Sequence, residues 1–186
     1  MELLQAINGR RSVREYSDEP VDDALVRQLI DAAIEAPSAI NQQPWCFIVV
    51  KRQSLLAQIS DKAKAHLLKA SLAAPAHPFR DMLNDPKFHI FYRAPVLVVI
   101  AAAEPTDWAV EDCALAAQNM MLAAHEAGLG TCWIGFAQHW LGTADGKAAL
   151  GLPASYVPVA PIIVGHARRK PAPVPRKAAN IRWIEG

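Results

Sequence analysis

Hydrophobic positions along the chain follow two patterns, a helical spacing of three to four residues and short continuous apolar runs. The helical spacing is clearest over residues 21–36, where one face carries Leu25, Val26, Leu29, Ile30, Ala33 and Ile34. Asp22 and Asp23 suit the positive end of this helix's dipole. Pro37 ends the helix, because the residue before a proline avoids helical geometry. The pattern predicts an amphipathic helix that packs on a core.

Two further stretches have helical patterns. One starts at Ser54 and carries apolar residues on one side: Leu55, Leu56, Ile59, Ala63, Leu67 and Leu68. The other, residues 110–127, is apolar on nearly every side, which is typical of a helix in a core or a subunit interface, and Gly128 is placed to end it. Four apolar runs predict buried strands: 46–50, 96–102, 131–134 and 159–164. Strands that alternate with helices ordinarily indicate a parallel, doubly wound sheet.

Two segments depart from these patterns. Residues 74–94 hold three prolines among several aromatic residues, so we expect an irregular segment that still packs on the protein. It is a candidate cover for a substrate site, and a packed loop without a functional role is the alternative. From Arg168 onward, prolines and basic residues replace periodicity. Such a tail either dangles or wraps around a partner.

Length and composition narrow the class of protein. A chain of 186 residues that is 52% hydrophobic fits one domain with a sizeable core. Its formal net charge of +1 argues against a nucleic-acid-binding protein, which needs a concentrated positive field. The most apolar run, residues 94–103, is far shorter than the roughly 20 residues of a membrane span, and the N-terminus does not resemble a signal peptide. We therefore expect a cytoplasmic protein with no membrane partner and no nucleic-acid partner.

The cysteine and histidine residues give no pattern typical of a disulfide framework or a metal site. The three cysteines, Cys46, Cys113 and Cys132, are widely spaced in apolar stretches and are predicted to be small core residues. The six histidines are scattered, and none pair at the spacing of a zinc site. We expect no metal site.

Positive charge gathers at the two ends of the chain. Arg10, Arg11 and Arg14 surround Ser12 near the start. Guanidinium groups donate paired N–H bonds that fit phosphate oxygens, and a serine hydroxyl adds a neutral donor. A second set of cations lies near the other end: Arg168, Arg169, Lys170, Arg176 and Lys177. We interpret the two ends as halves of one anion site, and a solvated basic surface is the alternative.

Together with a second motif, the N-terminal cluster resembles the nitroreductase family of flavin enzymes. The second motif is A-P-S-A-I-N-Q-Q-P-W at residues 36–45, one helix after R-R-S-V-R. Further segments are similar, in order, to the family's central helix, the turn and strand after it, its late strand and its basic tail: 112–124, 128–135, 161–166 and 175–177. The likeness spans nearly the whole chain.

This resemblance implies an α+β fold, a three-layer α/β/α sandwich with a mixed, mainly antiparallel sheet flanked by helices. It implies an intertwined homodimer whose subunits exchange extended arms. One FMN-binding domain would span residues 1–186, with residues 168–186 as an extended basic C-terminal arm. The family's flavin contacts fall on Arg10, Arg11, Ser12, Arg14, Pro37, Ser38, Ala39, Asn41, Ile134, Gly135 and Arg176.

The resemblance also implies what the basic residues do. Arg10 and Ser12 match the family's phosphate and ribityl contacts. Arg176 falls where the family places a late basic residue on the phosphate, and Arg169 and Lys177 stay open as substitutes. Arg14 matches a basic residue near the pyrimidine edge of the flavin ring, where a cation stabilises the anionic reduced ring.

The remaining positions would meet the ring itself. Residues 37–41 match the segment that the second subunit lays against the flavin. Ile134 and Gly135 match the place where backbone N–H groups approach the flavin's reactive nitrogen. Some relatives place a Lys or Asn before the second strand to hold the flavin, and Lys87 and Arg93 are the nearest residues here.

The implied function is an FMN-dependent oxidoreductase. NADH or NADPH would reduce the flavin, and hydride would pass to an electron-poor acceptor such as a nitroaromatic, a quinone or an enone. No catalytic side chain is expected, because the flavin carries the chemistry. Two alternatives stay open, a flavin-binding module with no diffusing substrate and a specialised relative that acts on one biosynthetic or halogenated substrate. The sequence does not decide between NADH and NADPH.

Overall fold

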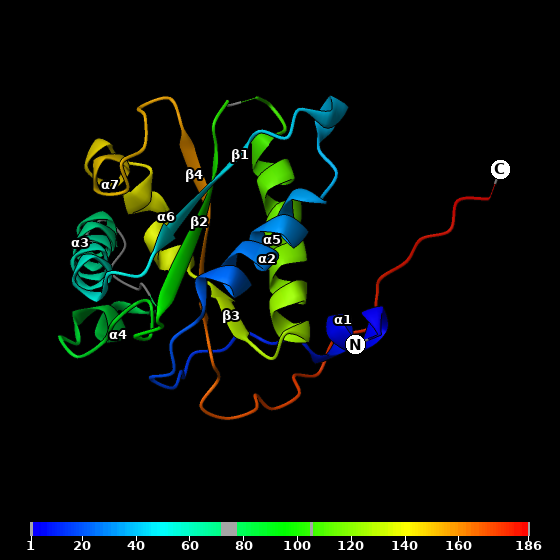
Figure 1. Cartoon of the computed structure of the whole chain (residues 1–186), viewed down its shortest axis with the longest axis horizontal. Helices are drawn as coiled ribbons and strands as arrows, with labels where there is room; N and C mark the ends of the chain where they lie inside the picture. Colours follow the sequence, from blue (N-terminus) through cyan, green and yellow to red (C-terminus); the bar gives the residue numbers. More distant parts are fainter. Residues whose placement is uncertain (1, 72–77, 105, 186) are drawn as a thin grey trace.

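The computed structural model of the protein describes residues 2–71, 78–104 and 106–185 (Figure 1). Four strands form the sheet: β1 (Trp45–Val50), β2 (Val96–Ala102), β3 (Gly130–Trp133) and β4 (Val157–Gly165). Around it, within the described ranges, lie helices α1 (Leu3–Gly9), α2 (Asp23–Ile34), α3 (Gln53–Ser71), α4 (Arg80–Asn84), α5 (Ala109–Glu126), α6 (Gly135–Leu141) and α7 (Ala144–Ala149), and a 3-10 turn η1 (Ala39–Asn41). No helix in these ranges has the length and apolar character needed to cross a membrane.

The strands lie in the order β1-β2-β4-β3, and each neighbouring pair is antiparallel. The parallel sheet that the alternation of strands and helices indicates is therefore wrong, and the mainly antiparallel sheet implied by the family resemblance is confirmed. The apolar pattern misleads because a strand buried on both faces has the same pattern in either direction. Parallel pairing in the described residues is confined to an isolated bridge between Ser12 and Thr131.

Helices cover both faces of the sheet (Figure 1). On one face, α2 and α5 pack on alternate strand residues, so that Val98 and Met120 belong to the same core. On the other face, α3 and α6 pack on the intervening residues, so that Leu97 and Ile59 belong to a second core. Because successive side chains of a strand point to opposite faces, β2 contributes to both cores. This three-layer α/β/α sandwich is the predicted fold class.

The long elements begin and end close to their predicted limits. Helix α2 begins after Asp22, whose Oδ1 accepts a hydrogen bond from the N–H of Ala24 at 3.0 Å, as an N-cap does. The pattern does not predict α6 and α7, because helices of seven and six residues hold too few repeats to show a period. Cys113 and Cys132 are buried as predicted, whereas Cys46 on the edge strand β1 is only half-buried.

Two irregular segments complete the chain. Of residues 74–94, the first four lie outside the described residues, and the rest contain the short helix α4 and a series of turns. Residues 172–185 are exposed throughout and extend away from the body of the protein past α1 (Figure 1). This outer part of the C-terminal arm (residues 168–186) departs from the otherwise closed outline of the described residues.

Candidate functional site

The N-terminal segment crosses the end of the sheet where β3 begins and β4 ends. The N–H of Val13 donates to the carbonyl of Thr131 at 2.9 Å, and the N–H of Arg168 donates to the carbonyl of Glu15 at 3.0 Å. Gly130 allows this close approach, because a Cβ there would lie 2.6 Å from Cγ2 of Val13. The arginines near the start of the chain are therefore held beside the beginning of the C-terminal arm.

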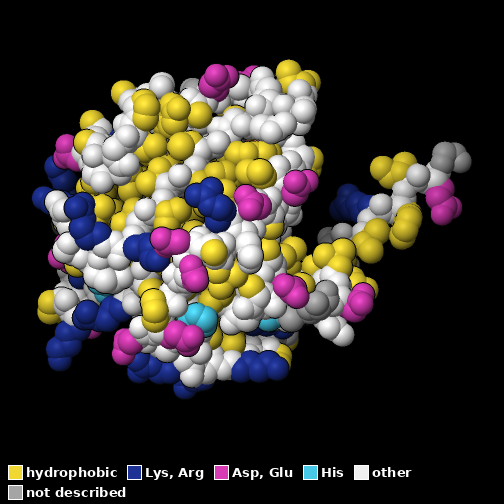
Figure 2. Space-filling view, viewed as in Figure 1, with side chains coloured by type: hydrophobic (Ala, Val, Ile, Leu, Met, Phe, Trp, Pro, Cys, Tyr) yellow, Lys and Arg dark blue, Asp and Glu magenta, His cyan; other side chains and the backbone are white. Residues whose placement is uncertain are grey.

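Lys and Arg side chains gather along the lower edge of the molecule (Figure 2), where these two segments lie (Figure 1). Burial lowers the pKa of Arg10, and the nearby charges of Arg176 and Arg11 lower it further. Like charges at this range repel one another unless an anion lies between them. Arg176 of the arm thus lies near enough to Arg10 to affect its pKa, and guanidinium groups gathered in this way suit an anion.

The guanidinium group of Arg11 makes hydrogen bonds to the nearby backbone. Its Nη1 donates to the carbonyls of Asn8 at 2.7 Å and Arg10 at 2.8 Å, so it closes the end of α1. Its Nε is buried and has no hydrogen-bond partner in the described part of the chain. A buried N–H without an acceptor is costly, so this donor suits a ligand oxygen.

Two cavities flank the arginine-bearing segment. One, of about 400 Å³, is lined by Ser12 and Arg14 together with Arg169 and Lys170. Arg169 is ion-paired with Glu15, whereas Lys170 has no ion pair with any residue in the described ranges. The other, of about 290 Å³, is lined by Arg10, Arg11, His125 and Lys170, among others. Burial lowers the pKa of His125, and the charges of Arg10, Arg11 and Lys170 lower it further.

A third cavity, of about 310 Å³, continues from the first through Arg14, which lines both. Aromatic side chains form much of its wall: Phe79, Tyr92, Trp133 and Phe136. Burial raises the pKa of Tyr92, and Arg14 beside it opposes that rise. An anion-binding end is thus joined by one arginine to a cavity with flat apolar walls, which suits a ligand with a charged tail and a planar ring.

Ile134 and Gly135 lie in this third cavity. The N–H of Ile134 donates to the carbonyl of Pro161 at 2.8 Å, so it is not available to a ligand. Gly135 is the first residue of α6, and its N–H therefore has no acceptor within the helix. A Cβ added at Gly135 would meet no atom within 4 Å, so the space in front of it is open. Of the two backbone N–H groups predicted to meet the flavin, only that of Gly135 is therefore available to a ligand.

The segment with Pro37, Ser38, Ala39 and Asn41 lies at the other end of the sheet. It leads into Trp45, which pairs with Ala102. The arginine segment pairs at the opposite end of the sheet, with Thr131 near the start of β3 and with Ala167 just after the end of β4. Strand β4 alone runs for nine residues, which separates the two ends of the sheet by roughly 25 Å at the usual strand rise. A single chain therefore does not bring these residues to Arg10.

The same loop has a strained backbone and a buried anchor. Ile40, Asn41 and Gln43 have φ values of 46°, 59° and 50°, a region that non-glycine residues seldom adopt. Oδ1 of Asp112 accepts a hydrogen bond from the N–H of Ala39 at 3.0 Å, and Oδ2 is buried without a partner in the described residues. This role of Asp112 is not visible in the sequence, because Glu111 lies beside it in the first turn of α5 and two carboxylates there are ordinary for a helix start.

The family of the protein follows from comparison with known sequences. A sequence model of the nitroreductase family matches residues 7–166, which include the arginine segment, the loop at residue 37 and the start of α6. The chain belongs to the nitroreductase family. The predicted family is confirmed.

Individual relatives agree with this assignment. A protein from Archaeoglobus fulgidus, to which an NADH dehydrogenase/NAD(P)H nitroreductase activity is attributed, is 31% identical over 170 residues, which cover 89% of this chain and 85% of that protein. One with the same attribution from Methanothermobacter thermautotrophicus is 36% identical over 140 residues, which cover 73% of this chain and 61% of that protein. The match therefore spans less than two thirds of the latter relative's length.

A solved structure supports the nitroreductase fold directly. The crystal structure of a nitroreductase with bound FMN from Bacteroides fragilis superposes with a TM-score of 0.83 over 100% of both chains, at 26% sequence identity. The helices on both faces of an antiparallel sheet are therefore those of a nitroreductase.

Proposed function

We propose that this nitroreductase-family protein is an FMN-dependent oxidoreductase that uses NADH or NADPH to reduce an electron-poor acceptor. The observation that carries the proposal is the continuity of two features through Arg14. A cluster of cations from both ends of the chain lies on one side, and a cavity with aromatic walls lies on the other. FMN has a phosphate at one end and a flat ring at the other. The proteins with a similar structure include a nitroreductase with bound FMN.

The basic residues have separate roles in this proposal. Arg10 and Arg176 bind the phosphate, because together they supply paired donors and two positive charges. Arg11 adds its buried Nε, and Ser12 adds a hydroxyl toward the ribityl chain. Arg14, where the two cavities meet, lies at the pyrimidine edge of the ring and stabilises negative charge there.

The ring end is positioned by backbone and by shape. The free N–H of Gly135 donates to the ring, and its missing side chain leaves room for close approach. When bound, FMN supplies the hydride chemistry that no side chain of the protein provides. Tyr92 and Phe136 exclude water from the open face of the ring, where the electron donor and the acceptor bind in turn.

We further propose that the working form is a homodimer. Pro37, Ser38, Ala39 and Asn41 lie too far along the sheet to reach Arg10 of the same chain, so a second copy must supply them. The strained loop also presents Ile40 with 90% of its surface exposed. An apolar side chain displayed on a strained, anchored loop is typical of a contact that forms on assembly.

Arm exchange would complete this dimer. Residues 1–186 act as one domain in this proposal, with residues 168–186 as its arm. The arm exposes Ile181, Trp183 and Ile184, and β1 is an edge strand whose outer side has no neighbouring strand among the described residues. An unpaired edge is a template for an added strand. We therefore place the arm of one subunit against the other.

Deleting residues 172–186 should test the arm. Burying three large apolar side chains stabilises an interface by about 1.5–3 kcal/mol each, so we expect the dimer dissociation constant to rise by at least about three orders of magnitude. Light scattering across a dilution series measures this constant. The matched control is full-length Arg176→Glu, which changes the charge near the phosphate but keeps the arm, and it should stay dimeric. A truncated chain as dimeric as the full chain would contradict arm exchange.

The oxidoreductase function has a direct test. Purified protein should be yellow, release FMN on denaturation, and lose its visible flavin absorbance when mixed with NADH or NADPH in a stopped-flow instrument. Addition of a nitroaromatic, a quinone or an enone should restore the absorbance. Protein that takes up no FMN would refute the proposal as a whole. Protein that binds FMN but is bleached by neither dinucleotide would instead be a flavin-binding module with no diffusing substrate.

A further inference from the structure

The buried face of α3 contains two polar residues among apolar ones. Ser60 is 1% exposed and Lys64 is 8% exposed. They lie on the same side of the helix as Leu56, Ile59 and Ala63. An ammonium group withdrawn from water is costly unless hydrogen bonds replace its hydration. The buried positions of Lys64 and Ser60 therefore imply that they have specific partners.

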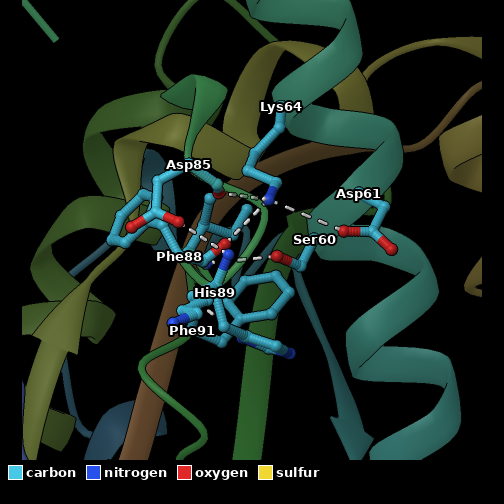
Figure 3. Close-up of polar contacts among 9 residues, drawn as sticks. Ser60, Asp61, Lys64, Asp85, Phe88, His89 and Phe91 are labelled. Atoms are coloured by element: carbon cyan, nitrogen blue, oxygen red, sulfur yellow. Dashed lines mark hydrogen bonds and ion pairs between the residues drawn. The ribbon is translucent and has the colours of Figure 1, made fainter. Parts of the chain in front are cut away.

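Those partners are backbone groups of residues 85–91 (Figure 3). Nζ of Lys64 donates to the carbonyls of Phe88 at 2.8 Å and Asp85 at 3.3 Å, with Asp61 Oδ1 at 3.8 Å. Oγ of Ser60 accepts a hydrogen bond from the N–H of Ile90 at 3.1 Å. This stretch has no helix or strand, so beyond a few turn hydrogen bonds, such as that from the N–H of Phe88 to the carbonyl of Asp85, its backbone depends on side chains for partners. Lys64 and Ser60 clamp it to α3.

The clamped stretch is followed by two residues in a costly conformation. Tyr92 and Arg93 have φ values of 50° and 55°. Non-glycine residues in this region cost on the order of 1 kcal/mol or more and persist only where the surroundings hold them. Turn hydrogen bonds hold these two residues, from the N–H of Tyr92 to the carbonyl of His89 at 2.8 Å and from the N–H of Ala94 to the carbonyl of Phe91 at 2.9 Å. The clamp fixes the stretch from which those turns start.

The clamp is connected to the third cavity through aromatic rings. The ring of Phe88 meets Tyr92 edge-on at a centroid distance of 5.7 Å and Phe136 at 6.3 Å. Phe136 in turn meets Phe79 at 5.4 Å. Tyr92, Phe136 and Phe79 line the cavity that also contains Gly135. The ring of Phe88 therefore supports the wall from behind, and the carbonyl of Phe88 is held by Lys64.

We propose that Lys64 is a positioning residue for acceptor binding, which fixes the aromatic wall of the cavity through the backbone of Phe88. This inference rests on the proposed function, in which that wall covers the open face of the flavin ring. Lys64 does not touch the ligand. It sets the distance between the wall and Gly135, and so it determines how well a flat acceptor fits between them.

The first experiment measures the clamp without any cofactor readout. Hydrogen exchange of the full-length protein is followed for residues 85–93 in Lys64→Met and in Lys62→Met, a matched control at an exposed position of the same helix. Losing a charged hydrogen bond costs about 1.5–3 kcal/mol, so we expect exchange in this stretch to become roughly tenfold to a hundredfold faster in Lys64→Met. Lys62→Met should exchange like the wild type. Equal rates in all three proteins would overturn the inference.

The second experiment separates positioning of the wall from general stability. In Lys64→Met, we expect KM for a bulky aromatic quinone to rise about tenfold, while KM for a small one and the dissociation constant of FMN change little. The FMN contacts proposed above lie on other elements, which is why FMN binding should be retained. Lys64→Arg keeps the positive charge and should restore part of the KM. A loss of thermal stability with the same KM for both quinones would show a merely structural role and overturn the inference.

Phe88→Leu completes the test, because it removes the ring that supports the wall but leaves the carbonyl that Lys64 binds. The two substitutions should be non-additive in KM, because both act on the same wall. Additive effects on KM would show that Lys64 acts by another route. If the wild type binds no FMN, the proposed function fails, whereas the exchange experiment still decides whether Lys64 clamps the wall.

Discussion

Replacing both Arg10 and Arg176 by glutamate is expected to remove the cofactor almost completely. The two guanidinium groups come from opposite ends of the chain and lie close enough for Arg176 to lower the pKa of Arg10. A hydrogen bond to a charged group contributes about 1.5–3 kcal/mol, so losing two should weaken FMN binding by at least about a hundredfold. Repulsion between glutamate and the phosphate adds to the loss. Quenching of FMN fluorescence during titration measures the dissociation constant.

A matched control for this experiment is Arg52→Glu, an exposed arginine before α3 that lines none of the three cavities. It makes the same change of charge elsewhere and should bind FMN like the wild type. The single substitutions should each have an intermediate effect. If the double variant retained its flavin, the phosphate would lie elsewhere, and the anion site formed by both chain ends would be wrong.

Gly135→Ala is expected to keep the fold and lose the ligand. An added Cβ meets no protein atom within 4 Å, and alanine is a better helix former than glycine, so thermal stability should hold or rise. The methyl group occupies the space where the flavin ring approaches the N–H of Gly135. Overpacking by one methyl costs about 1–3 kcal/mol, which corresponds to an FMN affinity lower by roughly fivefold to a hundredfold.

Gly142→Ala is the control at the other end of α6. Its added Cβ would lie 3.5 Å from the carbonyl oxygen of His139, an ordinary contact outside the cavity. Calorimetry should find similar stability in both variants and weaker FMN binding only in Gly135→Ala. Unchanged affinity in Gly135→Ala would show that the ring does not approach the start of α6.

The sequence predicted most of the secondary structure, because the long helices and strands are long enough to show a complete pattern of hydrophobic positions. Strand β2 coincides with the predicted run of residues 96–102, and α5 lies within one turn of its predicted limits. Helices α6 and α7 are too short for such a signal. Strand direction was predicted by family resemblance and not by periodicity, because a uniformly apolar strand carries no mark of its neighbour's direction.

The candidate site was predictable where its residues are adjacent in the chain. Arg10, Ser12 and Arg14 form one local motif, so their chemistry is visible before any fold is known. Lys64 and Asp112 were not predicted, because their partners are backbone groups far along the chain. The helical pattern around Lys64 nevertheless contained a signal, a lysine on the buried face of α3.

The sequence by itself determined the long helices, the strands, the arginine motif and the family, because these depend on local period and on residue order. Only the tertiary structure decided that the N–H of Ile134 is already bound to Pro161 and that the loop at Pro37 lies at the opposite end of the sheet. It also brings Arg176 near enough to Arg10 to lower its pKa, as the two basic chain ends suggested. These relations join residues that are distant in the chain. They arise from strand pairing and helix packing, and the order of residues along the chain does not specify which strands pair or which faces pack together.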